Sequence, residues 1–72
     1  MATFKFLGYL AEAAGGRTKE VVLEESTQLD ALLPPGFPRE GIIILINEKV
    51  GHIDSRINDN DSVLIMPVIS GG

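Results

Sequence analysis

The stretch SVLIMPV at residues 62–68 is apolar at nearly every position, which predicts a β-strand close to the end of the chain. The run IIILI at residues 42–46 predicts a second strand of the same kind. Two more strands are indicated near the N-terminus. Residues 3–7 begin with alternating polar and apolar side chains, and residues 18–23 end in VVL. The chain is therefore built mainly of strands, and residues 62–68 come after all the others.

The segments between these strands contain residues that favour helices and residues that end them. Residues 9–14 are rich in Ala and Leu, and Gly15-Gly16 follows where a helix often ends in a left-handed residue. Thr27 is the expected N-cap of a second helix, in which the leucines between residues 29 and 33 share one face. Pro34-Pro35 then ends this helix after barely two turns.

The remaining segments complete the expected fold. Residues 36–41 are expected to form a loop, residues 47–49 a turn, residues 50–53 a short edge strand, and residues 58–61 a turn built from Asn and Asp. The order strand, strand, helix, strand, short strand, strand predicts an α+β domain, because one helix covers only one face of the sheet. Its natural form is the β-grasp, a mixed sheet of four to five strands packed against one main helix, with the first and last strands parallel at the centre.

Composition narrows the possible functions. The 72 residues include no Cys and one His, so we expect neither disulfides nor a metal site, and apolar packing must stabilise the fold. A net charge of −4 argues against nucleic acid as the main partner and favours a basic protein surface. No apolar run approaches the roughly 20 residues that cross a bilayer, and no signal peptide is visible. We expect no membrane contact and a cytoplasmic location.

Signals for catalysis are weak. His52 stands close to Asp54, which invites a general-base interpretation. The pattern offers no positioned nucleophile beside them, so we interpret His52 as a surface residue of the edge strand. We therefore expect the chain to contain no catalytic residues and not to be an enzyme.

The C-terminal residues Ile69, Ser70, Gly71 and Gly72 are the strongest functional candidate. We expect residues 1–68 to form the domain and residues 69–72 to be a flexible tail. Glycine has no Cβ, so such an arm can enter a narrow channel and bring its carboxylate close to a nucleotide phosphate. The chain has no thiol of its own, so activation of Gly72 and any sulfur must come from partners. The expected activated terminus is Gly71-Gly72.

A second candidate lies on the sheet. Residues 42–46 and 63–68 are apolar on both alternating sets, whereas the helix covers one face only. We expect one set to face outward and bind a partner, because exposed apolar patches of a few hundred Å² mark interaction sites. The expected set is Leu64, Met66, Val68, Ile43 and Leu45. The alternatives are that the loop at residues 36–41 covers this face, or that the domain self-associates.

The sequence also resembles a known family. The segment FLGYLAEAAG at residues 6–15 is similar to the opening of MoaD proteins, the small subunit of molybdopterin synthase. The turn at residues 60–63, NDSV, resembles the one that begins the last strand in MoaD and ThiS proteins, where Gly often stands in place of Asn60. The ending from Pro67 to Gly72 resembles that of MoaD. MoaD endings commonly have two prolines before the tail, however, and the thiamin sulfur carrier ThiS is almost as similar there.

This resemblance implies a ubiquitin-like sulfur carrier that binds no cofactor itself. A ubiquitin-activating-type enzyme would use ATP to adenylate Gly72, and a sulfur donor protein would convert it to a thiocarboxylate. A MoaD-type carrier would then bind the larger, MoaE-like subunit of molybdopterin synthase and insert its tail there. The alternatives are a protein modifier of the small archaeal type, a sulfur carrier for thiamin or tRNA thiolation, and a plain interaction domain.

Overall fold

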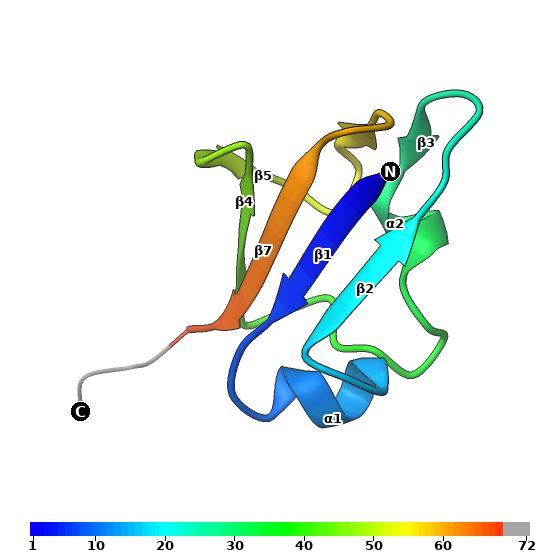
Figure 1. The fold of residues 1–72 in the computed structure, drawn as a ribbon. Coiled ribbons are helices and arrows are strands. Elements are labelled where there is room, and N and C mark those ends of the chain that lie inside the picture. Colours follow the sequence, from blue (N-terminus) through cyan, green and yellow to red (C-terminus); the bar gives the residue numbers. More distant parts are fainter. Residues whose placement is uncertain (69–72) are drawn as a thin grey trace.

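The computed structural model describes residues 1–68, so the tail expected at residues 69–72 lies outside the described chain. The elements follow one another in the order strand, helix, strand, strand, helix, and then strands to the end (Figure 1). Their bounds are β1 (Ala2–Phe6), α1 (Leu10–Ala14), β2 (Thr18–Val21), β3 (Thr27–Gln28), α2 (Leu29–Leu32), β4 (Ile42–Ile46), β5 (Lys49–Gly51), β6 (Arg56–Ile57) and β7 (Ser62–Pro67).

The main sheet has the order β2-β1-β7-β4-β5. β7 runs parallel to β1, with Phe4 opposite Val63, and antiparallel to β4, with Ile44 opposite Ile65. Figure 1 shows β7 between these two neighbours. The first and last strands are therefore adjacent and parallel at the centre of a mixed sheet, which confirms the β-grasp.

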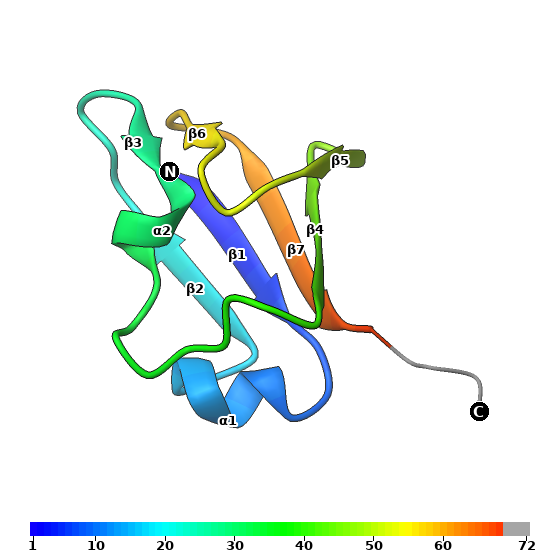
Figure 2. The ribbon, with the colours of Figure 1, turned by 180° about the vertical axis from the view of Figure 1, so that it is seen from behind.

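The core lies on one face of this sheet. Phe4, Ile44 and Ile65 alternate with more exposed neighbours and are at most 5% exposed. Leu29 from α2 and Phe37 from the following loop are buried against them. Figure 2 shows α1, α2 and this loop on the same side of the sheet. The opposite face carries no helix within residues 1–68 (Figure 1).

The helix that follows β3 is shorter than expected and begins differently. Thr27 is not its N-cap: Thr27 and Gln28 form β3, which pairs with β6, and Gln28 is the residue that precedes the helix. The backbone pairing of Thr27 with Ile57 replaces the capping geometry that its side chain favours on its own. Leu33 is already extended (ψ 148°), because the residue before a proline avoids the helical region. α2 is thus a single turn.

Other local predictions are confirmed. Gly15 ends α1 with φ of 86°, and the N–H groups of Gly15 and Gly16 donate to the carbonyls of Glu12 and Ala11, as in a Schellman motif. Asn60, in the predicted turn before β7, has φ of 76°. Within residues 1–68, no helix has the length and apolar character needed to cross a bilayer.

Candidate functional site

The sheet face opposite the core presents a continuous apolar surface. Leu64 on β7 lies opposite Leu45 on β4, and Met66 lies opposite Ile43 in the same strand pair. Residues that are directly opposite one another in a sheet point to the same face. Because Ile44, Val63 and Ile65 are buried on the core side, the five residues proposed from the sequence all lie on the other side. The structure thus brings these residues to one face of the sheet, and partner binding by them stays a prediction.

Two residues that the sequence did not single out extend this surface. Val50 on β5 lies opposite Leu45 and is 75% exposed. Leu7 follows β1 and is 46% exposed; its N–H donates to the Ile65 carbonyl, which brings it beside Met66. Only the strand pairing places these two residues here, so the local pattern could not identify them. We call this surface the open face, made of Leu7, Ile43, Leu45, Val50, Leu64, Met66 and Val68.

The loop expected as an alternative cover does not lie on the open face. Phe37, in the middle of this loop, is 2% exposed and packs edge-on against Phe6 in the core, with ring centroids 5.5 Å apart. The loop therefore covers the core side of the sheet. Within the described chain the open face remains accessible.

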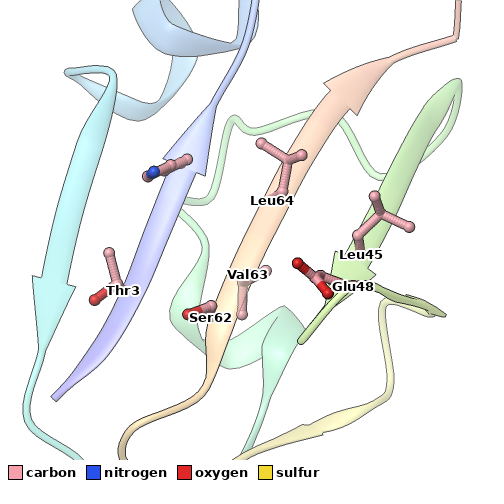
Figure 3. Close-up of a pocket in the computed structure, with 7 residues that line it drawn as sticks. Thr3, Leu45, Glu48, Ser62, Val63 and Leu64 are labelled. Atoms are coloured by element: carbon pink, nitrogen blue, oxygen red, sulfur yellow. The ribbon is translucent and has the colours of Figure 1, made fainter.

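A shallow depression of about 210 Å³ borders the open face where β1, β7 and the β4–β5 turn meet. Figure 3 shows Leu64 and Leu45 on neighbouring strands, with Glu48 reaching from the turn toward β7. Lys5, opposite Leu64 on β1, also lines the depression. The apolar side chains are thus flanked by one positive and one negative charge. Such an arrangement suits docking of a protein with complementary charges, because charges at the edge of an apolar contact fix its register.

The chain leaves the sheet at a point that we call the arm root, made of Gly8, Gly41, Pro67 and Val68. The Val68 N–H donates to the Gly41 carbonyl at 2.9 Å. Gly8 lies against Pro67, since a Cβ built on Gly8 would come within 3.3 Å of Pro67 Cγ. Figures 1 and 2 both show that the C-terminal end of β7 lies beside the start of β4. The arm root therefore lies beside the open face.

The activated terminus predicted at Gly71 and Gly72, and the tail residues Ile69 and Ser70, lie outside the described residues. Their placement in the fold remains a prediction. The structure does show that Val68, the last described residue, is 52% exposed and belongs to the open face.

The weaker candidates do not form a second site. His52 is exposed, and its backbone N–H donates to Ser55 Oγ at 2.9 Å, while the Ser55 N–H donates back to the His52 carbonyl. This is the hydrogen bonding of a turn. Among residues 1–68, no three His, Asp or Glu side chains come together as they would around a metal ion.

The carboxylate of Asp59 lies in the turn before β7, away from the open face. The pKa of Asp59 is lowered from its ordinary value, first by the Leu23 N–H that donates to its carboxylate and then by the N-terminal ammonium of Met1. This carboxylate joins the turn before β7 to the chain after β2 and to the N-terminus. Asp59 therefore has a structural role in the fold.

The β-grasp fold, the open face and the arm root together define a ubiquitin-like protein. Residues 4–72 match the ThiS family, so the chain belongs to the ThiS family. Small proteins of this ThiS and MoaD type are generally carriers without catalytic activity, and they work with adenylating enzymes and partner proteins. The resemblance predicted from the sequence is confirmed at the level of the family.

A solved structure has the same fold. The crystal structure of SAMP1 from Haloferax volcanii matches with a TM-score of 0.72 over 99% of this chain and 98% of that chain, at 23% sequence identity. At this level of identity the similarity concerns the fold alone. It confirms the β-grasp over nearly the whole length of both proteins.

Proposed function

We propose that this chain is a sulfur carrier for molybdopterin synthesis, whose C-terminal Gly72 is adenylated and then converted to a thiocarboxylate. The observation that carries the proposal is the family match, which runs through Gly71 to Gly72. The choice of molybdopterin rests on the resemblance of residues 6–15 and of the chain ending to MoaD proteins.

The chemistry follows from the weak reactivity of a carboxylate, whose oxygen is a poor leaving group. In the proposed first step a Gly72 carboxylate oxygen attacks the α-phosphorus of ATP on the partner enzyme, and pyrophosphate leaves. A persulfide of the donor protein then attacks the glycyl carbonyl carbon and displaces AMP, which leaves an acyl disulfide. A thiol attacks the donor's cysteine sulfur in this acyl disulfide, so that a disulfide forms and the thiocarboxylate is released. The thiocarboxylate sulfur then attacks an electrophilic carbon of the molybdopterin precursor, and water hydrolyses the resulting thioester, which leaves the sulfur on the precursor and restores the Gly72 carboxylate. This chain supplies the glycyl group and the adenylating enzyme supplies the catalytic groups.

The open face gives this proposal a docking surface. Four extended residues reach about 13–14 Å, so residues 69–72 can enter a partner's active site only when the partner binds close to Val68. The open face includes Val68 and extends from it over β7 and β4. We propose that the adenylating enzyme and the MoaE-like subunit bind there in turn.

The first experiment tests the carrier itself. The chain is incubated with a ubiquitin-activating-type enzyme, ATP and a sulfur donor, and its intact mass is measured. Exchange of one oxygen for one sulfur, localised to Gly72 by fragmentation, is the expected result. A variant lacking Gly71 and Gly72 is the control and should show no exchange. Glycyl-glycine remnants on lysines of other proteins, without thiocarboxylate, would instead identify a protein modifier.

A second experiment tests the pathway. Purified thiocarboxylated chain is mixed with a MoaE-like subunit and the molybdopterin precursor, and sulfur incorporation into the pterin is measured. Parallel reactions contain the thiamin thiazole-forming enzyme or a tRNA-thiolating enzyme in place of the MoaE-like subunit. Transfer only in the first reaction supports the proposal. Transfer only in one of the others would reassign the carrier to that pathway.

A further inference from the structure

No residue of the arm root is buried in the core. Val68 is half exposed, and a Cβ built on Gly41 would meet no atom within 4 Å. The hydrogen bond between them therefore adds no buried apolar surface to the core. Pro67 lies opposite Ile42 in the β4–β7 pair, and the bond from the Val68 N–H to the Gly41 carbonyl continues this ladder one residue beyond β7.

Two glycines in unusual conformations converge on this point. Gly8 has φ of 59° and Gly41 has φ of 70°, a region that residues with a side chain rarely adopt. Among the described residues, Gly15 is the other glycine with positive φ, and it ends α1. Gly8 allows Pro67 to approach closely, and Gly41 turns its carbonyl toward the Val68 N–H.

We propose that Gly8 and Gly41 are positioning residues that fix where the C-terminal arm begins. This proposal rests on the proposed function of Gly72. With Pro67 and Val68 held, an adenylating enzyme that binds the open face has only residues 69–72 left to position in its active site. If the arm root opened, at least one more residue would have to be ordered on binding. Ordering one backbone residue corresponds to roughly a 5- to 30-fold change in an equilibrium constant.

The test uses a matched pair of substitutions in one loop. Gly41→Ala places a side chain at positive φ and strains the backbone that presents the carbonyl to Val68. Gly36→Ala makes the same chemical change five positions earlier, where φ is outside the left-handed region and a Cβ meets no atom within 4 Å. Both residues are exposed, so both variants should retain the folded core. Thermal unfolding of each variant is measured before the kinetics to check that the core is folded.

Two quantities are then measured on each full-length variant. Amide hydrogen exchange of Val68 reports whether the arm root has opened, and pyrophosphate exchange with the adenylating enzyme gives KM and kcat for the chain as substrate. We expect faster Val68 exchange and a KM raised about 5- to 30-fold in Gly41→Ala, with kcat little changed, and neither effect in Gly36→Ala. Unchanged Val68 exchange in Gly41→Ala would overturn the proposal, as would faster exchange with an unchanged KM.

A second pair of substitutions, at Gly8 and Gly16, tests the same proposal outside the loop that contains Gly36 and Gly41. Gly8→Ala brings a Cβ to 3.3 Å from Pro67 Cγ at positive φ. At Gly16 the φ is not in the left-handed region, and a Cβ would lie 3.8 Å from the Thr18 carbonyl oxygen. The Gly8 variant should raise KM like Gly41→Ala, and the Gly16 variant should not. If the unmodified chain is not adenylated at all, the proposed function fails. If it is adenylated and both pairs give equal KM values, only the positioning proposal fails.

Discussion

Leu64 on β7 lies directly opposite Leu45 on β4, on the sheet face that α1 and α2 leave uncovered. Both side chains are partly exposed, whereas Val63, Ile65 and Ile44, their neighbours along the two strands, are buried on the core side. The pair lies at the centre of the open face, which makes it the first place to test for partner binding.

We expect Leu64→Ala to weaken binding to the adenylating enzyme about 10-fold, because apolar residues at the centre of an interface contribute most of its binding energy. The matched control is Thr18→Ala on the edge strand β2. Thr18 and Leu64 both lie opposite Lys5, one on each side of β1. Binding is measured by titration calorimetry and folding by thermal unfolding. Equal affinities for the two variants would show that the open face is not the docking surface.

Blocking the C-terminus should abolish sulfur transfer without affecting folding. A short extension after Gly72 converts its carboxylate to an amide, and deletion of Gly72 leaves the carboxylate on Gly71, one residue short of the proposed position in the partner's active site, while the described chain ends at Val68. Intact mass measures thiocarboxylate formation, and thermal unfolding should give the same midpoint as the unmodified chain. An extension that a protease removes back to Gly72 is the control and should restore transfer. A truncated chain that still accepted sulfur would contradict the proposed chemistry.

Arg39 should stabilise the loop that places Phe37 in the core. Its Nη1 donates to the carbonyls of Pro34 (2.8 Å) and Phe37 (2.6 Å), and its Nε donates to Asp30 Oδ1 (2.8 Å). The contact with Asp30 is largely exposed and contributes little on its own, whereas the partly buried carbonyls lose their donor in Arg39→Ala.

The free energy of unfolding in urea should fall by about 1–3 kcal/mol in Arg39→Ala. Arg39→Lys should recover only part of this, because an ammonium group cannot span the same acceptors. Arg17→Ala, at an exposed position before β2, is the control and should change stability by less than about 0.5 kcal/mol. If the Arg39→Ala and Arg17→Ala variants were equally stable, the loop would not depend on this guanidinium.

Asp59 gives the fold a dependence on pH at the acid end. Because its folded-state pKa is lowered, its contribution to stability is complete above the ordinary value of 3.8 and is lost as the pH falls through the lower folded-state pKa. The stability difference between the unmodified chain and Asp59→Asn should therefore be constant above about pH 5 and shrink below it.

Urea unfolding at a series of pH values measures this difference. The Asp59 side chain is 40% exposed, so the effect should be small and weaker in high salt. Acetylating the N-terminus removes the ammonium of Met1 and should reduce the pH dependence, but the Leu23 N–H should preserve part of it. A difference that does not vary with pH would exclude this role for Asp59.

Much of this fold could be predicted because its signals are local. The strand patterns, the Gly15 helix end and the Asn60 turn each depend on a few neighbouring residues, and all are found in the structure. The pairing of β3 with β6 could not be predicted, because two-residue strands show no periodicity. That pairing also explains the error at Thr27, whose cap signal was overridden by a partner 30 positions away, Ile57.

The candidate site likewise contains residues that the sequence pattern could identify and residues that it could not. Alternation in β4 and β7 was enough to group Leu64, Met66 and Ile43 on one face. Leu7 and Val50 join that face only through cross-strand register, which no single segment contains. Phe37 could have been suspected as a core residue, since an aromatic side chain in a Pro- and Gly-rich loop usually packs inward.

The central position of β7 has a consequence for biosynthesis. This strand is the last along the described chain, yet it pairs with β1 on one side and β4 on the other. A nascent chain cannot close its sheet until this strand has left the ribosome, because the β1 and β4 edges have no other partner in the fold to join them. An adenylating enzyme that recognises the open face, which includes β7, would therefore bind only chains in which the sheet is complete.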